Sequence, residues 1–147
     1  MKLQQDIFKK KPFVIGMVHL KALPGSPGFG GSFDEVLSAA KADAKLLARG
    51  GVDAIMVENF FDVPFTPSRV ETETVSAMTL AVKEVMTTAN ETRSIPIGVN
   101  VLRNDGISAM AIAACTGASF IRVNVLSGAR LTDQGVIEGI AYPLARL

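Results

Sequence analysis

Four short segments of the chain alternate aliphatic side chains with other residues, and each of them ends in a polar group. They span residues 13–20, 54–59, 97–102 and 119–125. Their two-residue period is that of a β-strand, in which successive side chains point to opposite faces. The polar groups on the non-aliphatic face are His19, Glu58, Asn100, Arg122 and Asn124. We therefore expect four strands, each with one face suited to a covering of helices and a second face that ends in polar groups.

The approach to the second segment is similar to the approach to the fourth. Residues 51–58 match residues 117–124 in their order of glycine, aliphatic and polar positions, and this match pairs Glu58 with Asn124. The chain therefore contains a repeated strand–helix unit.

Helical patterns lie between the expected strands. Ser32 precedes Glu35 by three residues, which is the spacing of a capping box, and predicts a helix that ends at a pair of glycines. Ser68 and Glu71 repeat this spacing and predict a second helix, followed by a polar exit over residues 87–94.

The remaining connections also carry signals for a helix and for loops. A third helix is expected over residues 107–116, with Asn104 and Asp105 as caps. After the fourth strand, the pattern predicts a polar loop and then the start of a further helix by residue 139. The loop 21–31 is rich in glycine and proline, which indicates a flexible lid rather than a phosphate cradle.

Strands that alternate with helices predict an α/β fold with a parallel sheet. The polar residues at the strand ends suit the lumen of a (β/α) barrel of the TIM type better than a doubly wound sheet, whose strands are aliphatic on both faces. A full barrel takes roughly 250 residues and eight units. The 147 residues contain four units. We therefore expect residues 1–147 to form the N-terminal half of one barrel domain, with two edge strands. The chain is then part of a longer barrel, which we favour, or two copies close one barrel.

Composition excludes several classes of function. The chain has 15 Lys and Arg against 14 Asp and Glu, so its charge gives no case for nucleic acid as a partner. No apolar run reaches the roughly 18 residues of a membrane span, and no signal-peptide core begins the chain, so a cytoplasmic location is expected. A single cysteine excludes a disulfide framework, and the glycines fit no nucleotide-binding spacing. No cofactor is predicted.

The polar strand ends carry the candidate chemistry. Glu58 among aliphatic walls suits a general acid or base, and His19 could share that role. Arg122 can bind a carboxylate or phosphate, while Asn100 and Asn124 can orient hydroxyls or carbonyls. This inventory fits a polyol or sugar phosphate. The alternative is that Glu58 and Arg122 form a buried pair that only fills the lumen. No metal site is predicted, because His19 and Glu58 supply too few ligands.

Loop residues at the same rim extend the candidate site. Arg103 and Asp133 are candidate substrate contacts or surface charges, since both follow strands of the expected sheet. Phe60, Phe61 and Phe65 lie in the loop after the second strand, where they either wall a pocket or plug the end of the sheet.

Four motifs in this order resemble the BtpA family. They lie at residues 16–27, 57–65, 98–105 and 121–139, and the resemblance runs from about residue 12 to 141. The family consists of TIM-barrel-like proteins about a hundred residues longer than this chain, which implies that the barrel continues beyond it.

The resemblance implies two kinds of function. The cyanobacterial member is a thylakoid-associated factor for photosystem I reaction-centre proteins, which implies a non-catalytic assembly factor with peripheral membrane association. Other members are linked with sugar uptake or carry sugar-phosphate and phosphoribosylanthranilate isomerase labels, which imply an enzyme of a small metabolite. The sequence leaves open whether the chain is an enzyme.

Overall fold

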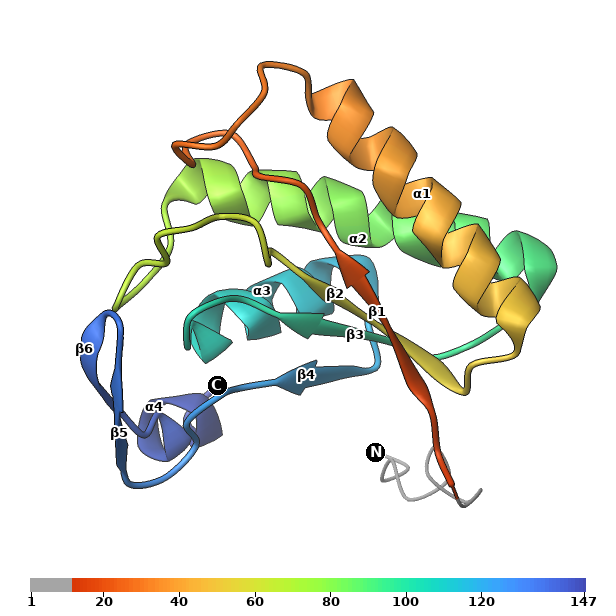
Figure 1. Ribbon diagram of the computed structural model, residues 1–147. Helices are drawn as coiled ribbons and strands as arrows, with labels where there is room; N and C mark the ends of the chain where they lie inside the picture. The colour runs from red at the N-terminus through yellow and green to blue at the C-terminus, as the bar shows by residue number, and fades with distance from the viewer. Residues whose placement is uncertain (1–11) are drawn as a thin grey trace.

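The computed structural model describes residues 12–147. Four parallel strands form one sheet in the order β1–β2–β3–β4, and a helix connects each strand to the next (Figure 1). The strands are β1 (Ile15–His19), β2 (Ala54–Glu58), β3 (Ile97–Asn100) and β4 (Phe120–Arg122). The connecting helices are α1 (Phe33–Gly50), α2 (Thr72–Thr92) and α3 (Gly106–Thr116). The prediction of an α/β fold with a parallel sheet is confirmed.

The aliphatic face of the sheet packs against the three helices. Val18, Val57 and Val99 are fully buried there, in one cluster with Ala44 of α1 and Val82 of α2. Burial of a valine side chain of this kind contributes about 1.5–3 kcal/mol. One face of the sheet is thereby fixed as the core, and the alternate residues must point to the other face.

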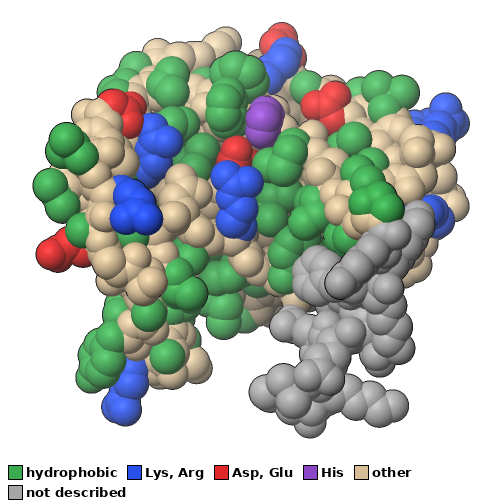
Figure 2. Space-filling view, turned by 60° about the horizontal axis from the view of Figure 1, so that its bottom comes forward, with side chains coloured by type: hydrophobic (Ala, Val, Ile, Leu, Met, Phe, Trp, Pro, Cys, Tyr) green, Lys and Arg blue, Asp and Glu red, His purple; other side chains and the backbone are tan. Residues whose placement is uncertain are grey.

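The open face of the sheet carries ordered rows of side chains. Parallel pairing aligns two rows across all four strands: Met17, Met56, Gly98 and Phe120, then His19, Glu58, Asn100 and Arg122. A Cβ atom on Gly98 would lie 2.4 Å from the Phe120 ring, so the ring occupies the space beside this glycine. Figure 2 shows this face, where the only histidine lies beside acidic and basic groups within hydrophobic side chains. The second row is polar and lies at the carboxyl ends of the strands.

The predicted cap at Ser32 is confirmed, and the second capping box is wrong. The Ser32 hydroxyl accepts a hydrogen bond from the Glu35 amide at 3.3 Å, and α1 ends at a glycine with φ of 82°. The second helix, α2, begins instead at Thr72, and Glu71 makes no side-chain cap. The carboxylate of Asp105 in the next unit accepts the Val70 amide at 2.9 Å, which holds residues 68–71 in the loop.

The predicted polar exit of α2 is also wrong, because the helix continues to Thr92. Thr88 and Ala89 are buried on the same face of the helix as Val85, so the packed stripe extends through this polar sequence. The Thr87 hydroxyl donates to the Lys83 carbonyl one turn earlier, which satisfies the side chain within the helix.

The segment after β4 departs most from the prediction. A β-hairpin, β5 (Ala129–Thr132) and β6 (Gly135–Glu138), occupies the place of the expected loop and helix start, and only the short α4 (Ala141–Ala145) follows. The hairpin lies at the end of the sheet where the strands terminate (Figure 1). In the described part of the chain β1 pairs only with β2, and β4 only with β3, so these four strands form an open sheet.

Candidate functional site

Glu58 is the centre of the polar row. Its side chain is only 4% exposed, and its Oε2 lies 3.4 Å from Nε2 of His19. Its Oε1 accepts a hydrogen bond from Nδ2 of Asn100 and lies 3.5 Å from Nη2 of Arg122. The three partners come from the strands on either side of β2 and from β4, so the sheet register brings four predicted site residues together.

Aromatic rings hold the imidazole of His19. The Phe60 ring stacks on it at 4.2 Å between centroids with 12° between the planes, and Phe61 meets Phe60 edge to face at 5.4 Å. Phe61 also lines a cavity beside the glycine-rich loop, and Phe65 lines a second cavity, beside Asn59 and Asp62. The pocket-wall interpretation therefore holds for Phe61 and Phe65, whereas Phe60 orients the histidine.

Arg122 and Asn100 differ in what they can still bind. The Arg122 side chain is 51% exposed and its Nη2 lies beside Glu58, so the guanidinium is accessible from solvent. Asn100 is fully buried, and its Oδ1 has no hydrogen-bond partner among the described residues. Its amide cannot be reversed, because Glu58 needs a donor at that position. The row thus combines an accessible cation with a buried acceptor that lacks a donor.

Asn124 does not belong to this row, contrary to the sequence alignment of the repeats. It is exposed and follows the end of β4, and Arg122 is the residue opposite Asn100. Asn104 binds the backbone beyond the end of β4. Its side-chain amide accepts from the Val125 amide at 2.8 Å and donates to the Val125 carbonyl at 3.1 Å, in place of a neighbouring strand.

The predicted cap role is therefore wrong for Asn104 and confirmed for Asp105. The Asp105 carboxylate accepts the amide of Ser108 at 2.9 Å and its hydroxyl at 2.6 Å at the start of α3.

Arg103 and Asp133 bind each other. Nη2 of Arg103 lies 2.7 Å from Oδ1 of Asp133, and its Nε donates to Gln134 at 2.8 Å. The guanidinium also lies 4.7 Å from the centroid of the Phe65 ring. The hydrogen bond of Gln134, more than the charge of Arg103, holds the pKa of Asp133 below its usual range. These residues fasten the hairpin turn to the β2–α2 and β3–α3 loops, and within residues 12–147 no hydrogen bond or ion pair joins them to the Glu58 row.

Asn59 and Asp62 form a relay that sequence reasoning missed. Oδ1 of Asn59 accepts the Leu102 amide at 2.7 Å, and its Nδ2 donates to Oδ2 of Asp62 at 3.1 Å. Oδ1 of Asp62 accepts the Leu23 amide at 2.7 Å. Burial raises the pKa of Asp62, and its hydrogen bonds to Leu23 and Asn59 oppose that rise. The relay ties together the loops after β1, β2 and β3.

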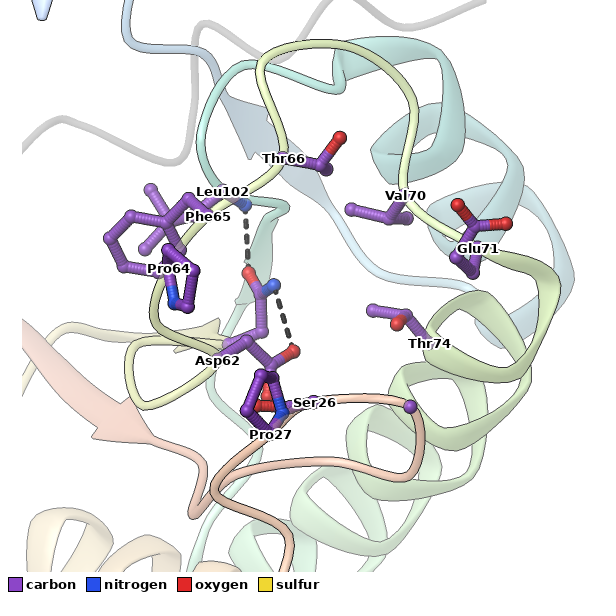
Figure 3. A pocket seen from close by; sticks show the side chains of 12 residues that line it. Ser26, Pro27, Asp62, Pro64, Phe65, Thr66, Val70, Glu71, Thr74 and Leu102 are labelled. Atoms are coloured by element: carbon purple, nitrogen blue, oxygen red, sulfur yellow. Dashed lines mark hydrogen bonds between the residues drawn. The ribbon is translucent and has the colours of Figure 1, made fainter. Parts of the chain in front are cut away.

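A cavity of about 100 Å³ adjoins this relay (Figure 3). Asn59, Asp62 and Leu102 line it, but Glu58 does not. The Glu58 row instead lies on the open face of the sheet, so the cavity and the row are separate places in the fold. Within residues 12–147, no three His, Cys, Asp or Glu side chains are grouped so that they could hold a metal ion.

Comparison with known proteins identifies the family. The model of the BtpA family matches residues 9–147. The chain belongs to the BtpA family. A BtpA-family protein of Synechocystis, named photosystem I biogenesis protein BtpA, is 54% identical over 133 residues, which are 90% of this chain and 45% of that protein.

Uncharacterized relatives extend the BtpA family to archaea. One from Thermococcus kodakarensis is 54% identical over 95% of this chain and 51% of its own length, and one from Methanocaldococcus jannaschii is 50% identical over 96% and 52%. The chain therefore spans about half the length of these relatives. No solved structure matches it. None of the helices within residues 12–147 is both long and apolar enough to cross a membrane.

Proposed function

We propose that the chain forms half of a TIM-type (β/α) barrel and binds a small, polyhydroxylated anionic metabolite, such as a sugar phosphate, at the carboxyl ends of its strands. The observation that carries this proposal is the row of His19, Glu58, Asn100 and Arg122 across four adjacent strands. A carboxylate, an imidazole, an amide and a half-exposed guanidinium converge there, which is the inventory that a hydroxylated anion requires.

Each residue of the row has a distinct role in the proposal. Glu58 is the general acid or base, because its carboxylate is the buried centre of the row. His19 is 37% exposed and stacked on Phe60, so it can exchange protons between Glu58 and solvent. Arg122 binds the anionic group of the metabolite through the donors that do not face Glu58.

A second candidate function comes from the comparison. The Synechocystis relative is named a photosystem I biogenesis protein, and it is 54% identical to this chain. In this alternative the chain serves as a non-catalytic assembly factor, and the Glu58 row is a structural ion-pair network.

Two variants of the row separate these functions. We expect Arg122→Met to weaken binding of phosphorylated polyols by about 10- to 100-fold, the effect of a lost charge-assisted hydrogen bond of about 1.5–3 kcal/mol. Glu58→Gln keeps binding but lowers turnover by about 10²- to 10⁴-fold, the usual contribution of a general acid or base. Thermal-shift screening of phosphorylated and unphosphorylated polyols against a full-length protein that carries this row supplies the ligand for both measurements.

Arg130→Met is the matched control. Arg130 lies in the exposed hairpin, and its guanidinium donates to the carbonyl of the adjacent Ala129. Binding that falls equally in the Arg130 and Arg122 variants would contradict a specific anion site. If both row variants leave ligand binding and turnover unchanged while Photosystem I accumulation still depends on the protein, the assembly function stands and the metabolite site does not.

A further inference from the structure

The cavity beside the Asn59–Asp62 relay has an unbalanced set of charges. Asp62 and Glu71 contribute carboxylates to its wall, and no lysine, arginine or histidine lines it. Asp62 is 8% exposed and forms no ion pair with a described residue; its two hydrogen-bond donors, from Leu23 and Asn59, are neutral. A buried carboxylate without a cation carries a desolvation penalty, which raises the pKa of Asp62. The cavity therefore favours a positively charged occupant.

Two hydroxyl groups in the same cavity lack partners. The Oγ atom of Ser26 is buried and has no hydrogen bond within residues 12–147. Thr74 is only 8% exposed and lines the cavity, and its side chain makes no hydrogen bond in the described part of the chain. Figure 3 shows Thr74 across the cavity from Asp62 and Ser26. A buried hydroxyl is rarely left without a partner, so the Ser26 hydroxyl, with the Thr74 side chain on the opposite wall, indicates a site for a hydrogen-bonding group between them.

Apart from Thr66, whose hydroxyl bonds to the backbone of Ser68 and Arg69, the rest of the wall is apolar. Pro27, Pro64 and Val70 surround the polar groups together with Phe65, whose ring already carries the Arg103 guanidinium. A volume of about 100 Å³ accommodates about three water-sized groups, since a water fills about 30 Å³ of the liquid. The part of the occupant that enters the cavity must therefore be small, with an apolar portion as well as a charge.

We propose that this cavity binds a small primary alkylammonium group. Its N–H donors would bind the Asp62 carboxylate and the hydroxyls of Ser26 and Thr74, while its alkyl part contacts the proline and valine walls. A divalent metal ion fits less well, because it requires several carboxylate or water ligands and tolerates apolar walls poorly. The site is separate from the Glu58 row and does not depend on its function.

Methylammonium is the probe, and potassium and tetramethylammonium at equal ionic strength are its comparison ions. We expect methylammonium to raise the melting temperature and to show saturable binding in ligand-observed NMR. Potassium lacks N–H donors, and tetramethylammonium lacks them and is larger, so neither should act in the same way. Equal stabilisation by either ion, or no saturation by methylammonium in the unmodified protein, would overturn the proposal.

Thr74→Val removes the hydroxyl with little change of shape, and we expect it to weaken methylammonium binding about fivefold. Thr79→Val is the matched control on the same helix, because the Thr79 hydroxyl donates to the Val75 carbonyl and does not line the cavity. Ser26→Ala gives an independent second test and should also weaken binding. Glu58→Gln should leave methylammonium binding unchanged. The proposal is wrong if the Thr74 and Ser26 variants bind as well as the Thr79 control.

Discussion

Exchange of the two side chains in the Asn59–Asp62 relay should rescue a loss of stability that each single substitution causes. The relay receives two backbone N–H groups, from Leu23 and Leu102, and contains one N–H donor of its own between the two side chains. A carboxylate at one end is required, because only an acceptor-only group can receive both a backbone donor and the Asn59 amide.

Asp62→Asn breaks this arrangement. An asparagine can still accept the Leu23 amide, but its own NH2 group then faces the NH2 group of Asn59. Reversal of Asn59 only moves the clash to the Leu102 amide. Loss of a hydrogen bond to a charged group is worth about 1.5–3 kcal/mol, and the relief of carboxylate desolvation offsets part of it. We therefore expect the free energy of unfolding to fall by about 2 kcal/mol.

Asn59→Asp places two carboxylates side by side. The relay can then form only if one of them binds a proton, so we expect a loss of about 2 kcal/mol at pH 7 and a smaller loss at pH 5. The double variant moves the carboxylate to position 59 and the amide to position 62, and every donor again has an acceptor. We expect its stability within about 1 kcal/mol of the unmodified protein, which corresponds to a coupling energy of about 3 kcal/mol.

Urea denaturation followed by far-ultraviolet circular dichroism measures all four proteins of this cycle. The design controls for the substitutions themselves, because the double variant contains the same atoms as the original pair in exchanged positions. A double variant that is no more stable than Asp62→Asn at pH 7 would refute these hydrogen-bond directions in the relay.

Three further predictions follow from the described contacts. The pKa of Asp62 measured by NMR should exceed 3.8, and Asn59→Ala should raise it further. Because the folded protein binds this proton more tightly than the unfolded chain does, the free energy of unfolding should rise as the pH falls from the folded pKa towards 3.8 and should fall as the pH rises through the folded pKa. Gly98→Ala should lower the unfolding free energy by about 1–3 kcal/mol, because its Cβ meets the Phe120 ring at 2.4 Å, and Phe120→Leu should restore part of the loss; additive effects would contradict this contact. Asp133→Asn should increase amide exchange in the β5–β6 hairpin and leave β2 unchanged; uniform exchange rates would show that the carboxylate does not fasten the hairpin.

The strands and their polar ends were predictable because alternation is a property of each segment alone. The two-residue period of residues 54–59 places Glu58 on the open face without knowledge of any partner. The register between strands was not predictable in this way. The repeat alignment pairs Glu58 with Asn124, whereas the sheet pairs Asn100 with Arg122 and its pairing ends there. The backbone beyond β4 bonds instead to the Asn104 side chain, and this contact leaves no signal in the periodicity of residues 119–125.

The relay and the hairpin escaped sequence analysis for different reasons. Asn59 and Asp62 bind backbone amides that lie 43 and 39 residues away, and a backbone donor has no residue type that a pattern could reveal. In the hairpin, Leu131 and Val136 pair with each other yet remain 84% and 65% exposed. A strand without a buried face has no clear alternation, so the sequence before Gly135 predicts the approach to a helix instead of a hairpin turn.

Asp105 makes the start of one helix depend on a residue that is synthesised later. Its carboxylate caps α3 and also holds the Val70 amide ahead of α2, so a nascent chain that ends before residue 105 lacks the contact that fixes the α2 entrance. Successive strand–helix units are therefore interlocked rather than independently completed. Asp105→Ala should accordingly loosen the first turn of α2, more than thirty residues upstream, as well as the start of α3. Amide hydrogen exchange should then become faster at both helix starts.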